Sequence, residues 1–398
     1  MSKKNDDFFS EKKPWSIIKD QLLACYLKPY FAKILATQRP AFYVDGFAGK
    51  GMFDDGKPGS PVIALEIISE SLLNTKFRSA GISSCFIELN YAEDLRNNIS
   101  KYTDVQIIKG KYEDKIEEQL AGKQSQNVFL YIDPYGIKSL HFSVFEKLSS
   151  KKFHSIEILV NLNTFGFIRE ACNVMHTNFD IEGLEDIVEF DDASNGNKQK
   201  SIANLTEVAG GEYWKEIIMD YKVGHINGYE AEKQFSEKYC QKLGEHFGYV
   251  LNMPIRLNPK QRPKYRMIHA TNHAQGCALM NDNMCKRWEA LQGIQNQGHI
   301  CLFGEDVENK LIDKAGVQKE ILEVLSSHTD YIDIDVFHAE FVSKYGVRFP
   351  TGDICKELEH LYNDSKVKVK RTPEVTKKTG RPSKFWTTGR GQTVKVRC

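Results

Sequence analysis

Short apolar runs alternate with stretches of helical periodicity through the first half of the chain. The apolar runs predict five strands, at 41–45, 84–88, 105–108, 128–133 and 156–161. The run at 128–133 is almost wholly apolar, as is typical of a strand in the middle of a parallel sheet. Helical patterns at 62–73 and 91–99 separate the first three strands. This alternation predicts an α/β fold with a doubly wound, mostly parallel sheet.

Other patterns flank this region. Periodic apolar positions over 15–35 predict an N-terminal helix that is broken or kinked near Pro29. Residues 176–225 interrupt the strand–helix rhythm, and we interpret them as an insertion that serves as a lid or a substrate platform. Two apolar runs at 249–256 and 265–270 have a short connection, which favours an antiparallel hairpin at the edge of the sheet.

The C-terminal residues predict a second, smaller domain. A charged stretch at 304–313 is predicted to be a linker, so we place the two domains at 1–303 and 304–398. Helical patterns follow at 316–326, 335–344 and 351–362, and β-like runs at 367–371 and 385–387 flank a basic tip. Three helices and a basic hairpin are the layout of a winged helix-turn-helix, in which the third helix enters a groove and the hairpin lies on the nucleic-acid backbone. The alternative is a small domain that docks onto protein.

Charge is distributed unevenly along the chain. The formal net charge is only +1, but from residue 365 onwards eleven Lys or Arg stand against one acid, Glu374. This excess predicts a nucleic-acid partner, DNA or RNA, at the C-terminal end. The candidate substrate-binding cations of the hairpin tip are Lys377, Lys378, Arg381 and Lys384.

Composition narrows the class of protein. A chain of 398 residues has room for about two to three domains. No apolar run reaches the ~18 residues that span a bilayer, and the charged N-terminus lacks the apolar core of a secretory signal, so we expect a cytoplasmic protein with no membrane partner. None of the nine cysteines forms a C-x-x-C pair, which favours buried free thiols over a metal site.

The candidate chemistry begins where the first predicted strand ends, because ligands of open α/β sheets bind outside the carboxyl ends of the strands. The segment DGFAGKGMF occupies 45–53, and its glycines let the backbone approach a ligand closely. A dinucleotide fingerprint requires the helix at once and an acid about 20 residues on, whereas here the helix starts some ten residues later and Glu88 lies 43 residues after Asp45. Both departures favour a cofactor without a pyrophosphate over NAD. The alternative is that the glycine segment is only a tight turn between the strand and the helix. The candidate cofactor-binding residues of this segment are Asp45, Gly46, Phe47, Gly49 and Gly51.

Acidic residues also close or follow the next strands. Glu88 ends the second strand, where a carboxylate can accept two hydrogen bonds from ribose hydroxyls. Tyr112 and Glu113 follow the third strand and are predicted to flank an adenine. A solvated strand-end acid is the alternative for Glu88 alone, but Asp45, Glu88 and Asp133 in series favour a cofactor site.

The tetrapeptide at 133–136 is the most specific signal. A carboxylate such as Asp133 can accept a hydrogen bond from an amine N–H and orient its lone pair, and an aromatic ring such as Tyr135 can stack on a flat base. With Pro134 between them, the segment resembles the Asp/Asn-Pro-Pro-Tyr/Phe signature of amino-methylating nucleic-acid methyltransferases, although the second proline is absent. It is closer to the Asp-Pro-Phe/Tyr-Gly of the tRNA guanine dimethyltransferases. A structural aspartate in a strand-to-turn junction is the alternative.

Two more strand ends are rich in polar groups. The segment after the fifth strand contains four candidate substrate-binding residues, Asn161, Asn163, Phe165 and Arg169. A His-x-x-x-His spacing at 269–273 ends the last predicted strand, which offers no helical i, i+4 face and no carboxylate partner. We therefore predict no metal site.

The joint set of segments resembles the three-Cys-motif partner protein family (TcmP). The matching segments are YVDGFAGKGMFDDGKPGSP, FIELN, YIDPYGIKSLHFSVFEKL, NLNTFGFIRE and YRMIHATNHAQGCALMNDNM, within roughly residues 15–295. This resemblance implies a class I S-adenosylmethionine (SAM)-dependent methyltransferase-like fold, whose edge hairpin the dinucleotide-binding fold lacks. It also implies a radical-SAM-like partner protein that carries three cysteines, and it leaves the reaction unassigned.

Three hypotheses follow. The first is a SAM-dependent N-methyltransferase acting on a nucleic-acid base, with Asp133, Pro134 and Tyr135 as the catalytic segment. The second is a catalytically silent methyltransferase-like subunit that binds nucleic acid or regulates the radical-SAM-like partner. The third is a nucleotide-handling enzyme such as a nuclease, which the sequence disfavours because no tight Asp/Glu/Lys cluster is present.

Overall fold

The computed structural model describes residues 9–12, 14–76, 81–178, 198–255, 263–295, 314–376, 380–389 and 391–398. The chain divides into two compact units, Met1–Asn272 and His273–Cys398. Among the described residues, no helix has the length and apolarity needed to cross a bilayer.

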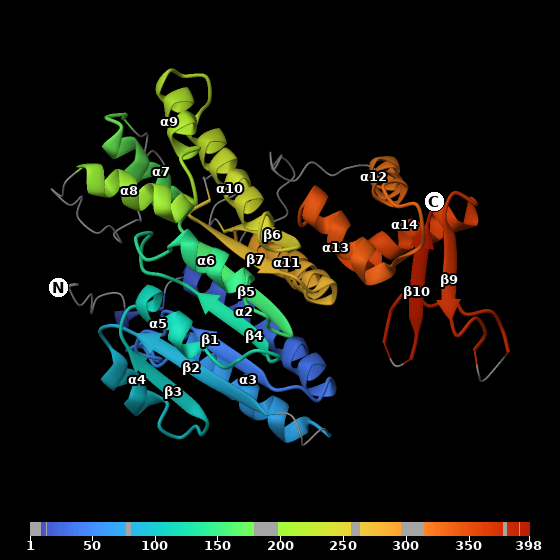
Figure 1. Cartoon of the computed structure of the whole chain (residues 1–398), viewed down its shortest axis with the longest axis horizontal. Helices are drawn as coiled ribbons and strands as arrows, with labels where there is room; N and C mark the ends of the chain where they lie inside the picture. Colours follow the sequence, from blue (N-terminus) through green and yellow to red (C-terminus); the bar gives the residue numbers. More distant parts are fainter. Residues whose placement is uncertain are drawn as a thin grey trace. The chain divides into compact units, whose positions relative to one another are not determined.

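A seven-stranded sheet forms the centre of the first unit (Figure 1). Its strands are β1 (Ala41–Asp45), β2 (Ile82–Glu88), β3 (Val105–Lys109), β4 (Asn127–Ile132), β5 (Ser155–Leu162), β6 (Tyr249–Ile255) and β7 (Tyr265–Thr271). The strand order is β3-β2-β1-β4-β5-β7-β6; the first five strands are parallel, and β7 is antiparallel to both of its neighbours. The predicted fold class, a doubly wound and mostly parallel sheet with an antiparallel edge hairpin, is confirmed.

Helices cover both faces of this sheet. The described helices of this unit are α2 (Pro14–Ala36), α3 (Ser60–Asn74), α4 (Ala92–Asn98), α5 (Tyr112–Gln119), α6 (Phe142–Ser149), α7 (Thr164–Val174), α8 (Lys198–Ala209), α9 (Trp214–Lys222) and α10 (Gly228–Gly244). Helices α8 and α9 pack on the neighbouring helices α6, α7 and α10. Figure 1 shows α2 and α3 on one face and α5 and α6 on the other. Helix α2 runs as one element of 23 residues that contains Pro29, so of the two predicted alternatives the break is wrong and the kink stays a prediction.

Successive side chains of the central strands point to opposite faces of the sheet, so an apolar layer forms on each face. Phe42 and Val44 of β1 join a buried cluster with side chains of α5 and α6, such as Ile116. Tyr43, between them in the sequence, faces the other way, and its ring lies 6.5 Å from that of Phe31 on α2. Because all five residues of β1 are buried, the strand is held on both faces and its carboxyl end is fixed in position.

The strand order reverses between β1 and β4, which are neighbours in the sheet. In open α/β sheets this reversal leaves a crevice outside the carboxyl ends of the strands, where ligands bind. The predicted motifs after β1, β2 and β4 therefore all lie at this one edge.

The second unit combines four helices with a small antiparallel sheet. Its elements are α11 (Ala274–Gln295), α12 (Lys314–Ser326), β8 (Ile332–Asp333), α13 (Ile334–Tyr345), α14 (Thr351–Asn363), β9 (Lys368–Thr372) and β10 (Thr393–Arg397). The sheet order is β8-β10-β9. The second strand of the hairpin was predicted at 385–387, which is wrong: β10 lies further on, where Val394 and Val396 alternate with exposed residues and are fully buried.

The division after Asn272 assigns α11 to the second unit, whereas the sequence analysis placed the boundary at 303. Two buried or half-buried polar contacts explain this. Asn281 Nδ2 donates to the carbonyl of Phe349 at 2.9 Å, and Gln275 Nε2 donates to Asp335 at 2.8 Å. The predicted linker at 304–313 lies outside the described residues.

Candidate functional site

Asp45 shapes the first loop from inside the protein. Its carboxylate, fully buried at the end of β1, accepts hydrogen bonds from Ser60 Oγ at 2.6 Å and from the Phe47 amide at 3.1 Å. Ser60 opens α3, so Asp45 ties the strand end to the next helix. Asp45 has no exposed surface, and its two hydrogen bonds hold the end of β1, the glycine loop and the start of α3 in position.

The three glycines of the loop lie against protein side chains. A Cβ at Gly46 would be 2.6 Å from the Tyr112 ring, and Gly49 and Gly51 have φ angles of +61° and +80°. A Cβ at Gly49 or Gly51 would meet Phe9 at 3.0 Å or Leu95 at 2.9 Å. These glycines therefore allow the turn and the close packing of neighbouring side chains. The ring of Phe47 lies 5.3 Å from that of Tyr112 and completes this packing.

Glu88 holds the glycine loop to the end of β2. One carboxylate oxygen accepts from the Gly49 amide at 2.8 Å, and the other accepts from the amides of Asn90 at 2.7 Å and Tyr91 at 3.1 Å. A carboxylate has about four acceptor positions, so roughly one remains for a ligand hydroxyl. The loop that sequence reasoning treated as a separate motif thus depends on Glu88.

The two residues after β3 differ in exposure. Tyr112 is buried against Gly46, and burial raises the pKa of its hydroxyl well above the usual range. Glu113 keeps 12% of its side chain exposed, lies 3.9 Å from Lys111 Nζ through one oxygen, and has no hydrogen-bond partner on the other. Glu113 Oε2 is therefore an acceptor near the sheet edge that still needs a donor.

Asp133 follows β4 and lies in a network that the sequence analysis did not foresee. Its two oxygens accept from Lys19 Nζ at 2.9 and 2.8 Å, and Asn161 Nδ2 and the Tyr131 hydroxyl donate at 2.7 and 3.3 Å. Lys19 comes from α2, and only 7% of its side chain is exposed, against 22% for Asp133. Asn161 Oδ1 is buried without a partner. The network fixes the Asp133 carboxylate and leaves part of it accessible.

The rest of the tetrapeptide separates into buried and exposed residues. Pro134 is buried, while Tyr135 is 47% exposed. Gly136 has φ +84° with nothing near the position of a Cβ, so it serves the turn. The exposed ring of Tyr135 thus stands two residues from a fixed carboxylate.

Residues 9–12 contribute a second unforeseen contact to the same edge. Phe9 packs on Tyr91 with ring centroids 5.0 Å apart, and its carbonyl accepts from the amide of Asp54 at 2.8 Å. Lys12 Nζ donates to the Pro58 carbonyl at 2.6 Å and forms a buried ion pair with Asp20. In the sequence this segment looks like part of a solvated, charged N-terminus, and no pattern indicates that Lys12 is buried.

The predicted substrate residues after β5 have mixed roles. Asn161 supports Asp133, whereas Asn163 caps α7 by accepting from the Gly166 amide at 2.7 Å. Phe165 is buried, and Arg169 is half-buried, with burial lowering its pKa. Asn163 and Phe165 therefore stabilise α7, and Arg169 remains as the accessible cation of this segment.

The basic residues of the hairpin belong to the second unit. Arg381 and Lys384 are both exposed. Lys377 and Lys378 lie outside the described residues. Among the described residues, no group of three or more His, Cys, Asp or Glu side chains is arranged to hold a metal.

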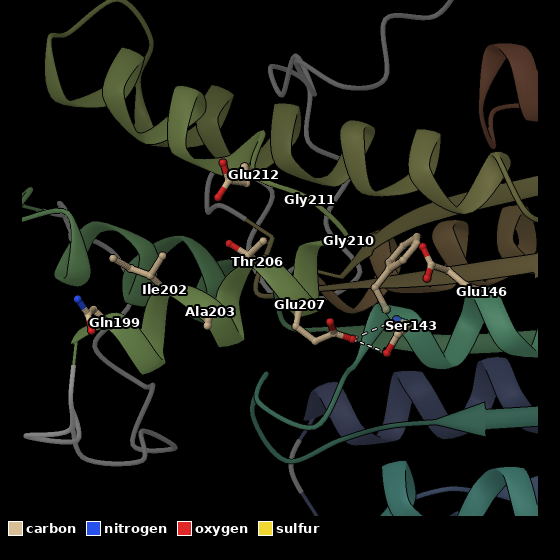
Figure 2. A pocket seen from close by; sticks show the side chains of 11 residues that line it. Ser143, Glu146, Gln199, Ile202, Ala203, Thr206, Glu207, Gly210, Gly211 and Glu212 are labelled. Atoms are coloured by element: carbon tan, nitrogen blue, oxygen red, sulfur yellow. Dashed lines mark hydrogen bonds between the residues drawn. The ribbon is translucent and has the colours of Figure 1, made fainter.

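A pocket of about 570 Å³ lies between α6 and α8 (Figure 2). Three carboxylates, Glu146, Glu207 and Glu212, are among its lining residues, and Glu207 accepts from Ser143 Oγ and the Ser143 amide. None of the predicted site residues lines it. Its acidic lining disfavours a polyanion, so we place the candidate site at the carboxyl edge of the sheet and not in this pocket.

Burial raises the pKa of Asp45 to about 7 and that of Asp20 to about 6. Between about pH 4 and pH 7 the folded chain therefore holds protons that the unfolded chain has released, so the free energy of unfolding falls as pH rises. Asp45→Asn should lessen this fall by up to about 1 kcal/mol per pH unit. Urea unfolding of wild type and variant at pH 5, 6 and 7 measures it, and parallel profiles would contradict the prediction.

No protein-family profile and no curated protein matches the chain. Solved structures similar to it include a geranyl diphosphate methyltransferase in complex with GPP and sinefungin, at 10% identity and a TM-score of 0.24, covering 61% of this chain and 75% of that one. PKMT2 from Rickettsia typhi in complex with AdoHcy has 10% identity and a TM-score of 0.27, covering 63% and 54%. A dimethyladenosine transferase from Plasmodium falciparum has 11% identity and a TM-score of 0.27, covering 89% and 98%. The fold is assigned from the strand order of the sheet.

Proposed function

We propose that the first unit is a SAM-dependent N-methyltransferase that acts on a nucleic-acid base. The observation that carries the proposal is the arrangement at one sheet edge of a fixed carboxylate, Asp133, beside an exposed aromatic ring, Tyr135. Acceptors suited to a nucleoside lie at the ends of the neighbouring strands. Glu88 and Glu113 provide them.

The cofactor fits the donors and acceptors present. Glu88 would accept a hydrogen bond from a ribose hydroxyl through its remaining acceptor capacity, and the unpartnered Glu113 Oε2 would accept from an exocyclic amino group of adenine. The glycine loop would line the site through backbone that Asp45 holds in place. When bound, SAM supplies an electrophilic methyl group.

The target amine would be oriented by the Asp133 network. Asp133 would accept a hydrogen bond from the amine N–H, which turns the nitrogen lone pair towards the methyl group. Because Lys19 neutralises this carboxylate, Asp133 acts as an acceptor and not as a strong base, and the amine proton leaves to water. Tyr135 would stack on the base, which must be unpaired or flipped out of a duplex.

A catalytically silent subunit is the second candidate, and specific packing favours it. Phe9 and Leu95 fill the space beside Gly49 and Gly51, and Lys19 already occupies the Asp133 carboxylate. In this case the protein would bind nucleic acid or regulate the radical-SAM-like, three-Cys-motif partner implied by its resemblance to the TcmP family. The second unit, which we propose to be a winged helix, would hold nucleic acid in both candidates.

Transfer of labelled methyl from SAM to tRNA, rRNA, single-stranded DNA and duplex DNA tests the choice. Turnover on one of these substrates that is lost in Glu88→Ala supports the methyltransferase. Saturable SAM binding with no transfer to any of them supports the silent subunit.

A further inference from the structure

The small sheet of the second unit places like charges directly opposite each other. In the register of the β9–β10 hairpin, Lys370 stands opposite Lys395 and Lys368 stands opposite Arg397. Directly opposite residues of antiparallel strands share a face with their Cβ atoms about 5 Å apart, and like charges there are destabilising. Four cations on one sheet face thus lower the stability of the hairpin. Their presence there is therefore better explained by binding than by folding.

These cations project away from the core. Val394 and Val396 alternate with Lys395 and Arg397 along β10 and are fully buried, so the basic residues face outward. Lys368, Lys370 and Lys395 are exposed. None of the four basic residues forms an ion pair with another described residue. Asp333 of β8 is the single carboxylate within the three strands, and it stands directly opposite Lys395.

One aromatic ring and one unpartnered donor lie on the same face. Lys370 Nζ lies 4.1 Å and Arg397 Cζ 4.7 Å from the centroid of the Tyr331 ring. Cation–π contacts of this kind hold two like-charged side chains close together despite their repulsion. Arg397 Nε is buried without a hydrogen-bond partner, so the cluster keeps a donor that needs an acceptor.

Protection of a sheet edge does not account for the cluster. Lysines on an edge strand prevent pairing with other chains, and β9 is an edge strand. Lys395 and Arg397, however, lie on β10, which is the central strand and is paired on both sides. Two of the four cations therefore lie on a strand that needs no protection from pairing with other chains.

The helix expected to enter a nucleic-acid groove is less suitable. On α14, Asp353, Glu357 and Glu359 outnumber the single cation Lys356, which already pairs with Asp353 at 2.6 Å. Phosphate groups would be repelled by this helix and attracted by the sheet.

We propose that the outer face of the small sheet, made of Lys368, Lys370, Lys395, Arg397 and Tyr331, is a binding site for the phosphodiester backbone of nucleic acid. This site deepens the proposed function, because it names where the second unit holds the nucleic acid. It differs from the groove contact of α14 that the winged-helix layout predicts. The three lysines and the guanidinium of Arg397 would each meet a phosphate oxygen.

Binding of fluorescently labelled single-stranded RNA and duplex DNA to the full chain, followed by anisotropy at several salt concentrations, tests this site. The triple variant Lys368→Gln/Lys370→Gln/Lys395→Gln should bind at least about tenfold more weakly near 0.1 M salt, with a salt slope reduced by about two to three. The control Lys319→Gln/Lys344→Gln/Lys356→Gln makes the same charge change on the helices of this unit and should bind within about threefold of wild type. Equal affinities of the two triple variants would overturn the assignment, as would failure of the wild type to bind either strand type.

A stability measurement separates loss of contacts from loss of fold. Lys368→Glu places a carboxylate opposite Arg397 in place of a like charge, so the variant should unfold at a slightly higher urea concentration than wild type. It should also bind RNA or DNA at least about tenfold more weakly. Weaker binding together with a lower unfolding midpoint would point to a structural role and contradict the site.

The same variants distinguish this inference from the proposed function. They should retain the wild-type affinity for SAM, because none of the substituted residues belongs to the first unit. Nucleic-acid binding that depends on the sheet face without any SAM binding would leave this inference standing and reject the methyltransferase. SAM binding together with unchanged nucleic-acid affinity in the sheet variants would reject this inference and leave the proposed methyltransferase standing.

Discussion

Asp133→Asn is expected to slow methyl transfer at least about a hundredfold while SAM affinity changes by less than about threefold. Asparagine places an amide donor where the carboxylate would accept from the target amine. It also leaves the cation of Lys19, only 7% exposed, without its counter-charge. Initial rates with labelled SAM and calorimetric SAM titration measure the two effects separately.

Lys19→Gln/Asp133→Asn provides the control for charge. This double variant restores neutrality, so its unfolding midpoint should recover relative to Asp133→Asn. Its rate should remain low if Asp133 orients the amine. Recovery of the rate together with stability would mean that the ion pair only supports the structure.

Glu232→Gln is expected to lower the free energy of unfolding by about 3–5 kcal/mol. Glu232 on α10 accepts from Arg266 of β7 through two bonds of 2.7 Å, and Thr164 of α7 donates at 2.5 Å. The side chains of Arg266 and Glu232 are only 6% and 1% exposed. Removing one partner therefore leaves a buried guanidinium without its counter-charge. Urea unfolding, followed by far-ultraviolet circular dichroism, measures the loss.

Two control variants test whether the loss of stability comes from the unpaired buried charge. Glu232→Met/Arg266→Met removes both charges and should recover most of the lost stability. Lys147→Gln breaks a pair with Glu117 in which both side chains are about half exposed, and it should cost less than about 1 kcal/mol. A loss for Glu232→Gln no larger than that of Lys147→Gln would contradict the account of this buried pair.

The sequence predicts the sheet well because the strands are short, apolar and followed by distinctive residues. Asp45, Glu88 and Asp133 all lie at the edge where the strand-end rule places them. The return strand β10 was missed because its two apolar residues alternate with basic ones inside a charged tail. With only two apolar positions, Val394 and Val396, the period-two pattern was too short to be recognised among the surrounding charges.

The partners of the site residues could not be predicted in the same way. Lys19 lies 114 positions from Asp133, and in the sequence it is one of several lysines near a charged N-terminus. Its pairing depends on how α2 packs against the sheet, which periodicity does not specify. The sequence also gives no sign that Glu88 accepts from Gly49, because both residues were assigned to a ligand and not to each other.

Calorimetric titration of SAM into wild type, Glu88→Ala and Glu93→Ala tests the central claim most directly. Glu93 lies on the next helix with 73% of its side chain exposed, so its variant is a matched control for loss of a carboxylate. We predict saturable binding to wild type and Glu93→Ala, and affinity at least about tenfold weaker for folded Glu88→Ala. Folded wild-type protein that does not bind SAM, or Glu88→Ala that binds as tightly as wild type, would contradict a cofactor site at this edge of the sheet.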